Sequence, residues 1–427
     1  MFRVPYDKTH LEFELLAGMR GRVVESQSVP PIADVPAAID AALARPVESL
    51  PVRNLAKRGD RVCIVFTDIT RVSPDWLVVP PVLLELERAG VRDEDITLLC
   101  GIGMHRPSTR EEKIAKLGEA VVDRYRVIDN EPRNPQALVD LGIVNDIPLS
   151  VHRAAYDADL LMATGIVEPH QYAGYSGGCK TVAVGAAGEP LIQFSHGPRF
   201  VDHPGTRLGR LEGNPFHEAI TEAGLRAGLR FVVNVVLDDD RNVVAVMAGE
   251  PVATHTRLVE FARAMYQVSI PQQYDLAIGG VGFPKDANLY QASRAASYLF
   301  FAPQPVVKPG GYLIVPARCP EGVGEGVGEQ RFLAAMRDAP DVAFILEDGR
   351  KNGYPPGQQR AFVMAKVLEQ NKVIIVGSEC PDVVRQCKMI PAPTMAEALA
   401  VAAADLGTNL DVLVVPHALL TLPVVEG

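Results

Sequence analysis

The chain has 427 residues, a length that suits two or three domains, and its 48% hydrophobic and 22% charged residues are typical of a globular protein with a sizeable core. Its formal net charge of -10 argues against a general nucleic-acid binder, which needs a basic surface. The N-terminal segment MFRVPYDKTH lacks the apolar stretch of a signal peptide, no apolar run is long enough to cross a bilayer, and the six cysteines have no metal-binding spacing, so we expect a cytoplasmic protein with reduced thiols.

The first half of the chain alternates between expected strands and helices. Buried strands are expected at RVCIVFT (61–67), DITLLC (95–100) and ADLLMATG (158–165), which are apolar and bounded by polar residues. Helical patterns follow the first two of these strands, and the third strand runs into a glycine-rich loop. FVVNVVLDDDRNVVAVMAG (231–249) is expected to form a hairpin that turns at 238–242, with a helix after it to about residue 267.

The alternation begins again after an expected linker at 270–275. Strands are expected at DLAIGG (275–280), GGYLIVPA (310–317), KVIIVG (372–377) and DVLVVP (411–416), and helices at 287–301, 327–338 and 395–407. This pattern predicts an α/β protein with two Rossmann-like domains that contain parallel sheets and right-handed crossovers. We expect an N-terminal domain at 1–270, to which a tail at about 405–427 returns, and a C-terminal domain at 273–398.

Three expected strands of the N-terminal domain end in polar loops, namely TDITR, GIGMHRPST and EPHQYAGYSGGCK. Ligands of open α/β sheets bind beyond the carboxyl ends of the strands, so these loops are expected to converge on one crevice. Taken singly, each loop has a simpler interpretation: Asp68 as a helix cap, Arg71 as a surface cation, and His105 as a turn residue. Ser176 to Gly178 is either a tight turn that opens a helix or a backbone site for phosphate. The chain has no GxGxxG or Walker motif, which argues against an ordinary dinucleotide or nucleoside triphosphate site.

The loops are more specific when they are considered together and in order. DITR, GIGMHRPST and EPHQYAGYSGGCK are followed by SHGPRFVDHPGTRLGRLEGNP (195–215) and GGVGFPKDANLYQASRA (279–295). The order and spacing of these motifs resemble those of the lactate racemase family, which comprises nickel-pincer-nucleotide-dependent 2-hydroxy-acid racemases and epimerases. The resemblance covers nearly the whole chain. The resemblance implies an isomerase that interconverts D- and L-2-hydroxy acids, lactate and other short-chain acids, in a cleft between the two domains.

The resemblance also implies roles for particular residues. The cofactor would be pyridinium-3,5-bisthiocarboxylic acid mononucleotide nickel, with His196 as the metal ligand of the protein and Lys180 as a covalent anchor. The other cofactor contacts would come from Asp68, Thr70, Ser176, Gly177 and Gly178. The two acid/base residues would be His105 and His170. The substrate would be bound by Arg71, Tyr290, Gln291 and Arg294. Because Arg294 stands where the family has lysine, the carboxylate clamp is expected to be bidentate.

The chemistry of a 2-hydroxy acid agrees with these roles. Proton abstraction at C2 is difficult because the carboxylate makes that proton weakly acidic, whereas hydride removal gives a flat 2-keto acid that can be reduced on either face. Inversion redirects the hydroxyl group, so two bases are needed, and an imidazole with a pKa of about 6.5 works in both directions near neutral pH. One protein ligand is enough for nickel when the cofactor supplies the others.

Several alternatives stay open. Within the family, the chain could be a malate racemase, with Arg360 reaching a second carboxylate, or a gluconate-type 2-epimerase. Outside it, a nicotinamide-dependent dehydrogenase would need a dinucleotide fingerprint, and a non-catalytic nickel or nucleotide carrier would need neither base. His203 and His217 lie near His196 in sequence, and either could support the metal site without binding the metal. Surface or core positions are expected for the histidines that have no supporting neighbours, which are His10, His152, His255 and His417. The expected partners are a small 2-hydroxy acid, cofactor-maturation enzymes and a second copy of the chain, but neither nucleic acid nor a membrane.

Overall fold

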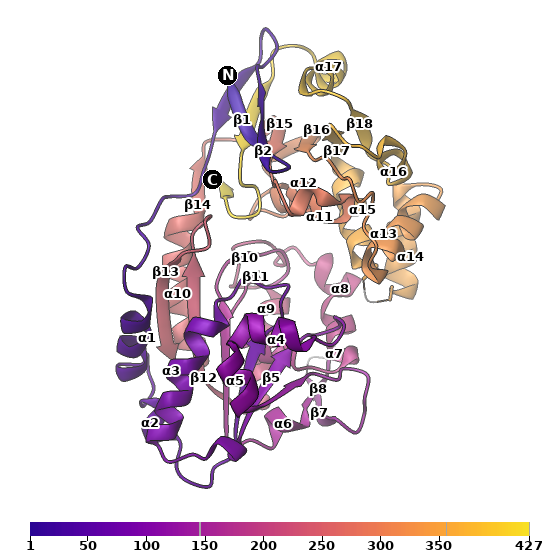
Figure 1. Ribbon diagram of the computed structural model, residues 1–427. Coiled ribbons are helices and arrows are strands. Elements are labelled where there is room, and N and C mark those ends of the chain that lie inside the picture. Colours follow the sequence, from indigo (N-terminus) through magenta and orange to yellow (C-terminus); the bar gives the residue numbers. More distant parts are fainter. Residues whose placement is uncertain (145–146, 356, 427) are drawn as a thin grey trace. The chain divides into compact units, whose positions relative to one another are not determined.

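The computed structural model describes residues 1–144, 147–355 and 357–426, and the chain divides into two compact units (Figure 1). The N-terminal unit comprises Ser28–His196 and Leu211–Met265. The C-terminal unit comprises Met1–Gln27, Gly197–Arg210 and the chain from Tyr266 onward. Each unit contains its own mainly parallel sheet and its own hydrophobic core. The expected α/β class with Rossmann-like parallel sheets is therefore confirmed.

The sheet of the N-terminal unit has the strand order β13-β12-β9-β4-β5-β6. These strands span Val62–Thr67 (β4), Ile96–Gly101 (β5), Arg126–Asp129 (β6), Leu160–Ile166 (β9), Leu229–Leu237 (β12) and Val243–Gly249 (β13). Neighbours pair in parallel except β12 and β13, which form the expected antiparallel hairpin. The chain moves from β4 to β5 on one side and returns to β9 on the other. The strand order therefore reverses between β4 and β9, and ligands of open α/β sheets bind at such a point.

Both faces of this sheet are covered, which explains why its central strands are apolar throughout. In β4, Ile64 and Phe66 pack in a core with α1 and α3, whereas Cys63 and Val65 face a second core on the opposite side. The helices of the unit are α1 (Val35–Ala44), α2 (Val52–Leu55), α3 (Asp75–Arg88), α4 (Arg110–Leu117), α5 (Glu119–Arg124), α6 (Arg153–Tyr156), α7 (Glu189–Ser195), α9 (Pro215–Arg226) and α10 (Pro251–Tyr266). Small hairpins are formed by β7 (Leu138–Val144) with β8 (Ile147–His152), and by β10 (Pro169–His170) with β11 (Gly174–Tyr175).

The sheet of the C-terminal unit is parallel, with the strand order β18-β17-β16-β15-β19-β3. Its strands span Arg20–Val23 (β3), Tyr274–Gly279 (β15), Val307–Pro316 (β16), Lys372–Val376 (β17), Ile390–Ala392 (β18) and Asp411–Val415 (β19). Two pairs accompany it: β1 (Phe2–Tyr6) with β2 (Thr9–Phe13), and β14 (Gln267–Ile270) with β20 (Leu422–Val425). The helices are α8 (Pro198–Val201), α11 (Leu289–Ala292), α12 (Arg294–Phe300), α13 (Val327–Asp338), α14 (Val342–Asn352), α15 (Gln359–Gln370), α16 (Pro381–Gln386) and α17 (Met395–Leu406).

The structure corrects the expected boundaries. The tail at 405–427 was expected to return to the N-terminal domain, but β19 pairs with both β15 and β3 and so lies inside the C-terminal sheet. The physical reason is that the edge of β15 opposite β16 needs hydrogen-bonding partners, and β19 supplies them. The helix expected at 287–301 is two helices, α11 and α12, on either side of Ser293.

In the described part of the chain, no helix is long and apolar enough to span a membrane.

Candidate active site

The loops that follow β4, β5 and β9 leave the N-terminal sheet on both sides of its switch point. They carry six residues that the sequence singled out, which are Asp68, Thr70, Arg71, His105, His170 and Lys180. The loops after β5 and β9 also touch directly, because the Gly103 N–H donates to the Gly185 carbonyl at 3.0 Å. A Cβ atom on Gly101 would lie 3.1 Å from the Cα of Gly185, so this close approach leaves little room for a side chain at Gly101.

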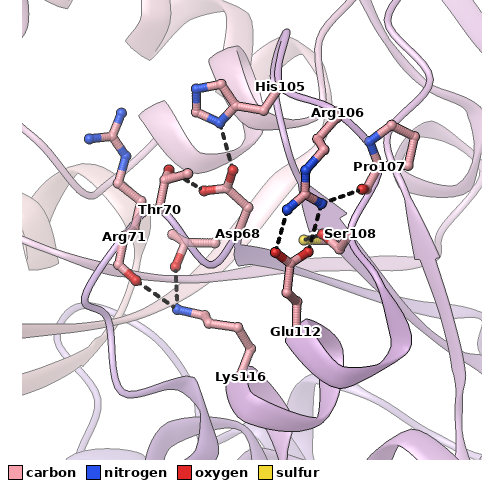
Figure 2. A network of polar contacts seen from close by, with 11 residues as sticks. Asp68, Thr70, Arg71, His105, Arg106, Pro107, Ser108, Glu112 and Lys116 are labelled. Carbon is pink, nitrogen blue, oxygen red and sulfur yellow. Dashed lines mark hydrogen bonds and ion pairs between the residues drawn. The ribbon is translucent and has the colours of Figure 1, made fainter. Parts of the chain in front are cut away.

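Asp68 and His105 form a hydrogen-bonded pair (Figure 2). The His105 Nδ1 atom lies 2.6 Å from Asp68 Oδ2, and Thr70 donates its hydroxyl to Asp68 Oδ1 at 2.7 Å. Burial alone would raise the pKa of Asp68, but the hydrogen bonds from His105 and Thr70 and the charge of Arg71 keep it below its usual value. The ionised carboxylate therefore accepts a hydrogen bond from Nδ1–H of His105, which leaves the lone pair of the neutral ring on Nε2.

A buried lysine fixes the loop that carries Asp68 and Arg71. Lys116 Nζ lies 2.7 Å from the carboxylate of Asp75 and donates to the carbonyl oxygens of Arg71 (3.2 Å) and Ser73 (2.7 Å). Only 4% of the Lys116 side chain and none of the Asp75 side chain is exposed. Figure 2 shows the Lys116 ammonium below the loop, while the Arg71 guanidinium points away from it, to the side on which His105 lies. The ion pair thus fixes the backbone and leaves the Arg71 side chain for another role.

The segment after His105 is fixed by its own helix. Arg106 forms two hydrogen bonds with Glu112, at 2.6 and 2.9 Å, and Glu112 also closes a capping box with Thr109 at the start of α4. These bonds lower the pKa of Glu112 to about 2, so the carboxylate stays charged. A short, well-anchored loop therefore presents His105 beside Asp68 (Figure 2).

His170 has the opposite hydrogen-bonding pattern to His105. It ends β10, and its Nδ1 atom accepts from the backbone N–H groups of Tyr172 (3.3 Å) and Ala173 (3.2 Å). A neutral imidazole that accepts at Nδ1 carries its proton on Nε2. The two histidines are therefore set in different tautomers, His105 with a basic Nε2 and His170 with a protonated Nε2.

His196 lies at the end of α7 against two aromatic rings. The ring centres of Tyr172 and Phe216 are each 5.2 Å from that of His196, in edge-to-face arrangements. The His196 Nδ1 atom is 2.9 Å from the carbonyl oxygen of Ile192, so Nδ1–H donates there and the lone pair lies on Nε2. Burial lowers the pKa of His196 to about 4, opposed by the Ile192 carbonyl and helped by the positive charge of Lys180. His196 is thus a neutral imidazole, the form that binds metal ions.

The hydrogen bonds of Ser176 to Gly178 do not support the backbone phosphate site that the sequence suggested for these residues. The Ser176 hydroxyl donates to the Ile166 carbonyl at 2.7 Å and accepts the Glu168 N–H at 3.1 Å. The Gly178 N–H donates to the side chain of Asn234 at 2.8 Å. These groups shape the loop from inside, and they lead into a π-helix at Thr181–Gly185, just after Lys180. Ser176 is not a helix cap, because Lys180 is the residue that precedes the helix.

Ring contacts and charge effects link several of the predicted residues of the N-terminal unit. His170 packs at 5.9 Å on Tyr172, which contacts His196. The charges of both Lys180 and Arg71 act on His196, and Arg71 acts on Asp68, the partner of His105. Among the described residues, no group of three or more His, Cys, Asp or Glu side chains is arranged to bind a metal ion.

The predicted substrate residues Tyr290, Gln291 and Arg294 lie together on α11 and α12 of the C-terminal unit. Arg294 donates to the Tyr298 hydroxyl at 3.1 Å and to the Gln291 side chain at 3.4 Å. Arg360, on α15, is buried and lies 5.9 Å from the centre of the Tyr290 ring. Burial raises the pKa of Tyr290, although Arg360 and Arg294 oppose the shift, so the phenol stays protonated at neutral pH.

Sequence patterns did not indicate three residues that shape this site. Lys116 occurs in a charged helix and looks like a surface residue, Asn234 occurs inside a strand, and His255 occurs in a helix without polar neighbours of obvious function. All three are buried. A polar residue within an apolar strand, such as Asn234, is the one signal that the sequence did offer, since such residues need a buried partner.

Comparison with known proteins supports a single family. Models of the lactate racemase N-terminal domain and C-terminal domain match residues 6–209 and 271–422. A lactate racemase from Thermoanaerobacterium thermosaccharolyticum is 30% identical over 427 residues, 97% of this chain and 96% of the relative. A lactate racemase from Lactiplantibacillus plantarum is 31% identical over 388 residues, 89% of each chain.

Solved structures agree with this assignment. The lactate racemase apoprotein from Thermoanaerobacterium thermosaccharolyticum superposes with a TM-score of 0.87 and 28% identity, over 99% of both chains. A Thermotoga maritima protein has the same fold, with a TM-score of 0.68 and 20% identity over 92% of this chain and 98% of its own. The chain therefore belongs to the lactate racemase family and is an enzyme, an isomerase of the racemase type.

Proposed function

We propose that the protein interconverts the D and L enantiomers of lactate and of other short-chain 2-hydroxy acids. The observation that carries the proposal is the opposite tautomer of its two candidate acid/base residues. Neutral His105 has its lone pair on Nε2 because its Nδ1–H donates to Asp68, whereas His170 has a protonated Nε2 because its Nδ1 accepts hydrogen bonds from backbone N–H groups. A racemase needs one base to take the hydroxyl proton of one enantiomer and one acid to return a proton to the other. In the reverse direction the two residues exchange roles.

Arg71 is the proposed carboxylate-binding residue of the N-terminal unit. Its backbone is fixed by Lys116, which leaves the guanidinium to make charge-assisted hydrogen bonds. Tyr290, Gln291 and Arg294 are assigned to the substrate on the family resemblance. A guanidinium at Arg294 can bind a carboxylate through two parallel N–H groups, which an ammonium cannot do.

His196 and Lys180 suit the cofactor that the family resemblance implies. His196 would bind nickel through Nε2, with Nδ1–H donated to the Ile192 carbonyl as is usual for metal-binding histidines. Lys180 would be the covalent anchor, and Asp68, Thr70 and the turn at Ser176 to Gly178 would be near the cofactor. When bound, the nickel-pincer nucleotide would supply the hydride acceptor and donor for the C2 hydrogen. The hydroxyl groups of Thr70 and Ser176 are used within the protein, which favours a supporting role for these two residues.

The test is to produce the chain together with the cofactor-maturation enzymes and incubate it with each lactate enantiomer in D2O. Racemisation that leaves hydrogen at C2 supports hydride transfer, whereas deuterium at C2 would show proton abstraction. Net formation of pyruvate with a soluble nicotinamide would indicate a dehydrogenase, and bound nickel without any conversion would indicate a carrier. His196→Ala should lose nickel, and Lys180→Ala should lose any covalent mass increment. Full nickel content and turnover in His196→Ala would contradict the assignment.

A malate racemase is the second candidate, and one observation favours it. Arg360 places a second guanidinium next to Tyr290, in the unit that also contains Arg294. Two guanidinium groups suit a substrate with two carboxylates. The Arg360 Nη1 atom also donates to Ser297 Oγ at 3.0 Å, so part of this side chain serves the fold. We therefore rank lactate above malate, and a sugar acid such as gluconate below both.

A further inference from the structure

The turn that leads to Lys180 is fastened by two buried side chains from other elements. Asn234, in β12, accepts the Gly178 N–H at its Oδ1 atom (2.8 Å), while its Nδ2 donates to the Val233 carbonyl (3.0 Å). His255, in α10, lies with Nε2 2.9 Å from the carbonyl oxygen of Ser176. Asn234 is fully buried and His255 is 5% exposed. Each therefore makes a hydrogen bond to the turn that water cannot replace without opening the core.

The backbone of the turn fits tightly against these side chains. Gly177 and Gly178 have φ values of +83° and +54°, in the left-handed region that favours glycine. A Cβ atom on Gly178 would lie 2.9 Å from the His255 ring, and one on Gly177 would lie 3.1 Å from Asn234 Oδ1. The two side chains thus set the path of the turn by contact as well as by hydrogen bonding.

The path of the turn decides where Lys180 lies. Lys180 donates its N–H to the Gly177 carbonyl at 3.1 Å and immediately precedes the π-helix. Lys180 follows Gly178 by only two residues, so any rotation of the turn would move Lys180.

We propose that Asn234 and His255 are positioning residues that hold the turn before Lys180 and so fix the point at which the Lys180 side chain leaves the backbone. The proposal rests on the proposed function, in which Lys180 is the covalent anchor of the cofactor. His255 acts as a flat, neutral donor: it gives Nε2–H to Ser176 while its ring fills the space beside Gly178. Burial and the stacked ring of His217, at 5.6 Å, lower the pKa of His255 to about 4, which agrees with a neutral ring.

The experiment uses the cofactor-free chain, so it does not depend on activity. Three variants separate the features of the two residues. His255→Phe keeps a ring but removes the donor, His255→Gln keeps an N–H donor without the ring, and Asn234→Leu removes the acceptor. Thr254→Val is the matched control, because Thr254 is also buried in α10 but its hydroxyl makes no hydrogen bond among the described residues. Circular dichroism and thermal melting identify any variant that fails to fold.

Two measurements report on the turn itself. Amide hydrogen exchange over residues 174–186 should be about threefold to tenfold faster in His255→Phe and Asn234→Leu, the change expected for loss of one hydrogen bond. Competitive acetylation should change the reactivity of Lys180 relative to that of Lys308, an exposed lysine of the other unit, by a similar factor. His255→Gln should restore both values towards those of the unchanged protein, and Thr254→Val should leave both as they are.

Unchanged exchange and Lys180 reactivity in folded His255→Phe and Asn234→Leu would overturn the proposal, as would equal effects of His255→Phe and His255→Gln. Failure of the proposed function gives a different result. In that case the co-produced chain would lack nickel and a mass increment at Lys180, while the effects on the cofactor-free turn would still be observed.

Discussion

The His105 Nδ1 atom lies 2.6 Å from Asp68 Oδ2, in a pair whose carboxylate is buried and whose imidazole is half exposed. One partner is thus held by the protein while the other remains accessible. The ionised Asp68 fixes both the tautomer and the direction of the ring, because it can accept a hydrogen bond but cannot donate one. In its neutral form, His105 therefore presents the lone pair of Nε2 to the accessible side.

The first prediction tests this pair. Asp68→Asn introduces an amide that can donate to Nδ1 and so favour the wrong tautomer of His105. We expect kcat to fall roughly 10²- to 10⁴-fold, the usual contribution of a general base, with a smaller change in KM. Steady-state rates of the cofactor-loaded enzyme in both directions would measure it. Thr70→Val, which removes only the second hydrogen bond to Asp68, should cost much less, and an Asp68→Asn enzyme with unchanged kcat would contradict the role.

Local patterns predicted the central elements because they depend on neighbours in the chain. The strand at 61–67 and the hairpin at 231–249 are apolar runs with clear ends, and both were found. Pairing between distant segments was not predictable in this way. The Arg20–Val23 strand is polar and exposed, so its place beside β19 follows only from the completed C-terminal sheet. The tail was misplaced for the same reason.

At the active site, too, the residues in distinctive loops were predicted from the sequence, whereas residues buried by packing between distant elements were not. His105, His170 and His196 were noticed because their loops have distinctive sequences, and the hydrogen bonds then revealed their tautomers. Lys116 and His255 were missed, because their burial depends on how helices pack on the sheet and their own sequence neighbours do not indicate it. Candidate ligand-binding residues can therefore be predicted from a sequence more readily than the buried residues that hold them in position.

The second prediction concerns the buried ion pair of Lys116 and Asp75. Lys116→Met leaves the carboxylate of Asp75 buried without its charged partner, so we expect the free energy of unfolding to fall by about 3–5 kcal/mol. Chemical denaturation followed by circular dichroism measures it. Arg226→Gln breaks the exposed Arg226–Glu222 pair and is the control, with an expected change of at most about 0.5 kcal/mol. Equal losses in the two variants would show that burial of the Lys116 pair adds nothing.

The third prediction is a loss of stability in mild acid that depends on His255. The folded protein keeps this ring neutral down to a pKa of about 4, whereas an unfolded chain binds the proton below about pH 6.5. Between these values the unfolded state binds more protons, so the free energy of unfolding falls as the pH decreases, by up to about 3 kcal/mol for this group. Denaturant titrations at pH 7, 6, 5 and 4.5 would record the slope.

His255→Gln should flatten that slope, because glutamine does not titrate. Burial also lowers the pKa values of His217, His196 and His152, so part of the slope should remain after His255 is replaced. His10→Gln, at an exposed position, is the control and should follow the unchanged protein. A slope that is the same with and without His255 would contradict the prediction.

The last prediction concerns substrate choice. Arg360 is buried, donates to Ser297 and lies beside the Tyr290 ring, so its main effect is expected to be support of Tyr290. The loaded enzyme should then use lactate and 2-hydroxybutyrate with kcat/KM values that differ by about 10- to 200-fold at most, the discrimination that one methylene allows. Malate and gluconate should be poorer substrates. Arg360→Gln should lower kcat/KM for lactate and malate by similar factors, because it weakens a support common to both.

Arg360→Lys separates charge from geometry in the same panel, since an ammonium keeps the charge but loses the planar fork. If Arg360 instead binds a second carboxylate, the unchanged enzyme should prefer malate, and Arg360→Gln should abolish that preference while lactate turnover survives. Arg360→Lys should then retain part of the malate activity. These results together would identify a dicarboxylate, not lactate, as the substrate. If Arg360 only supported Tyr290, its replacement would lower the activity towards both acids and not towards malate alone.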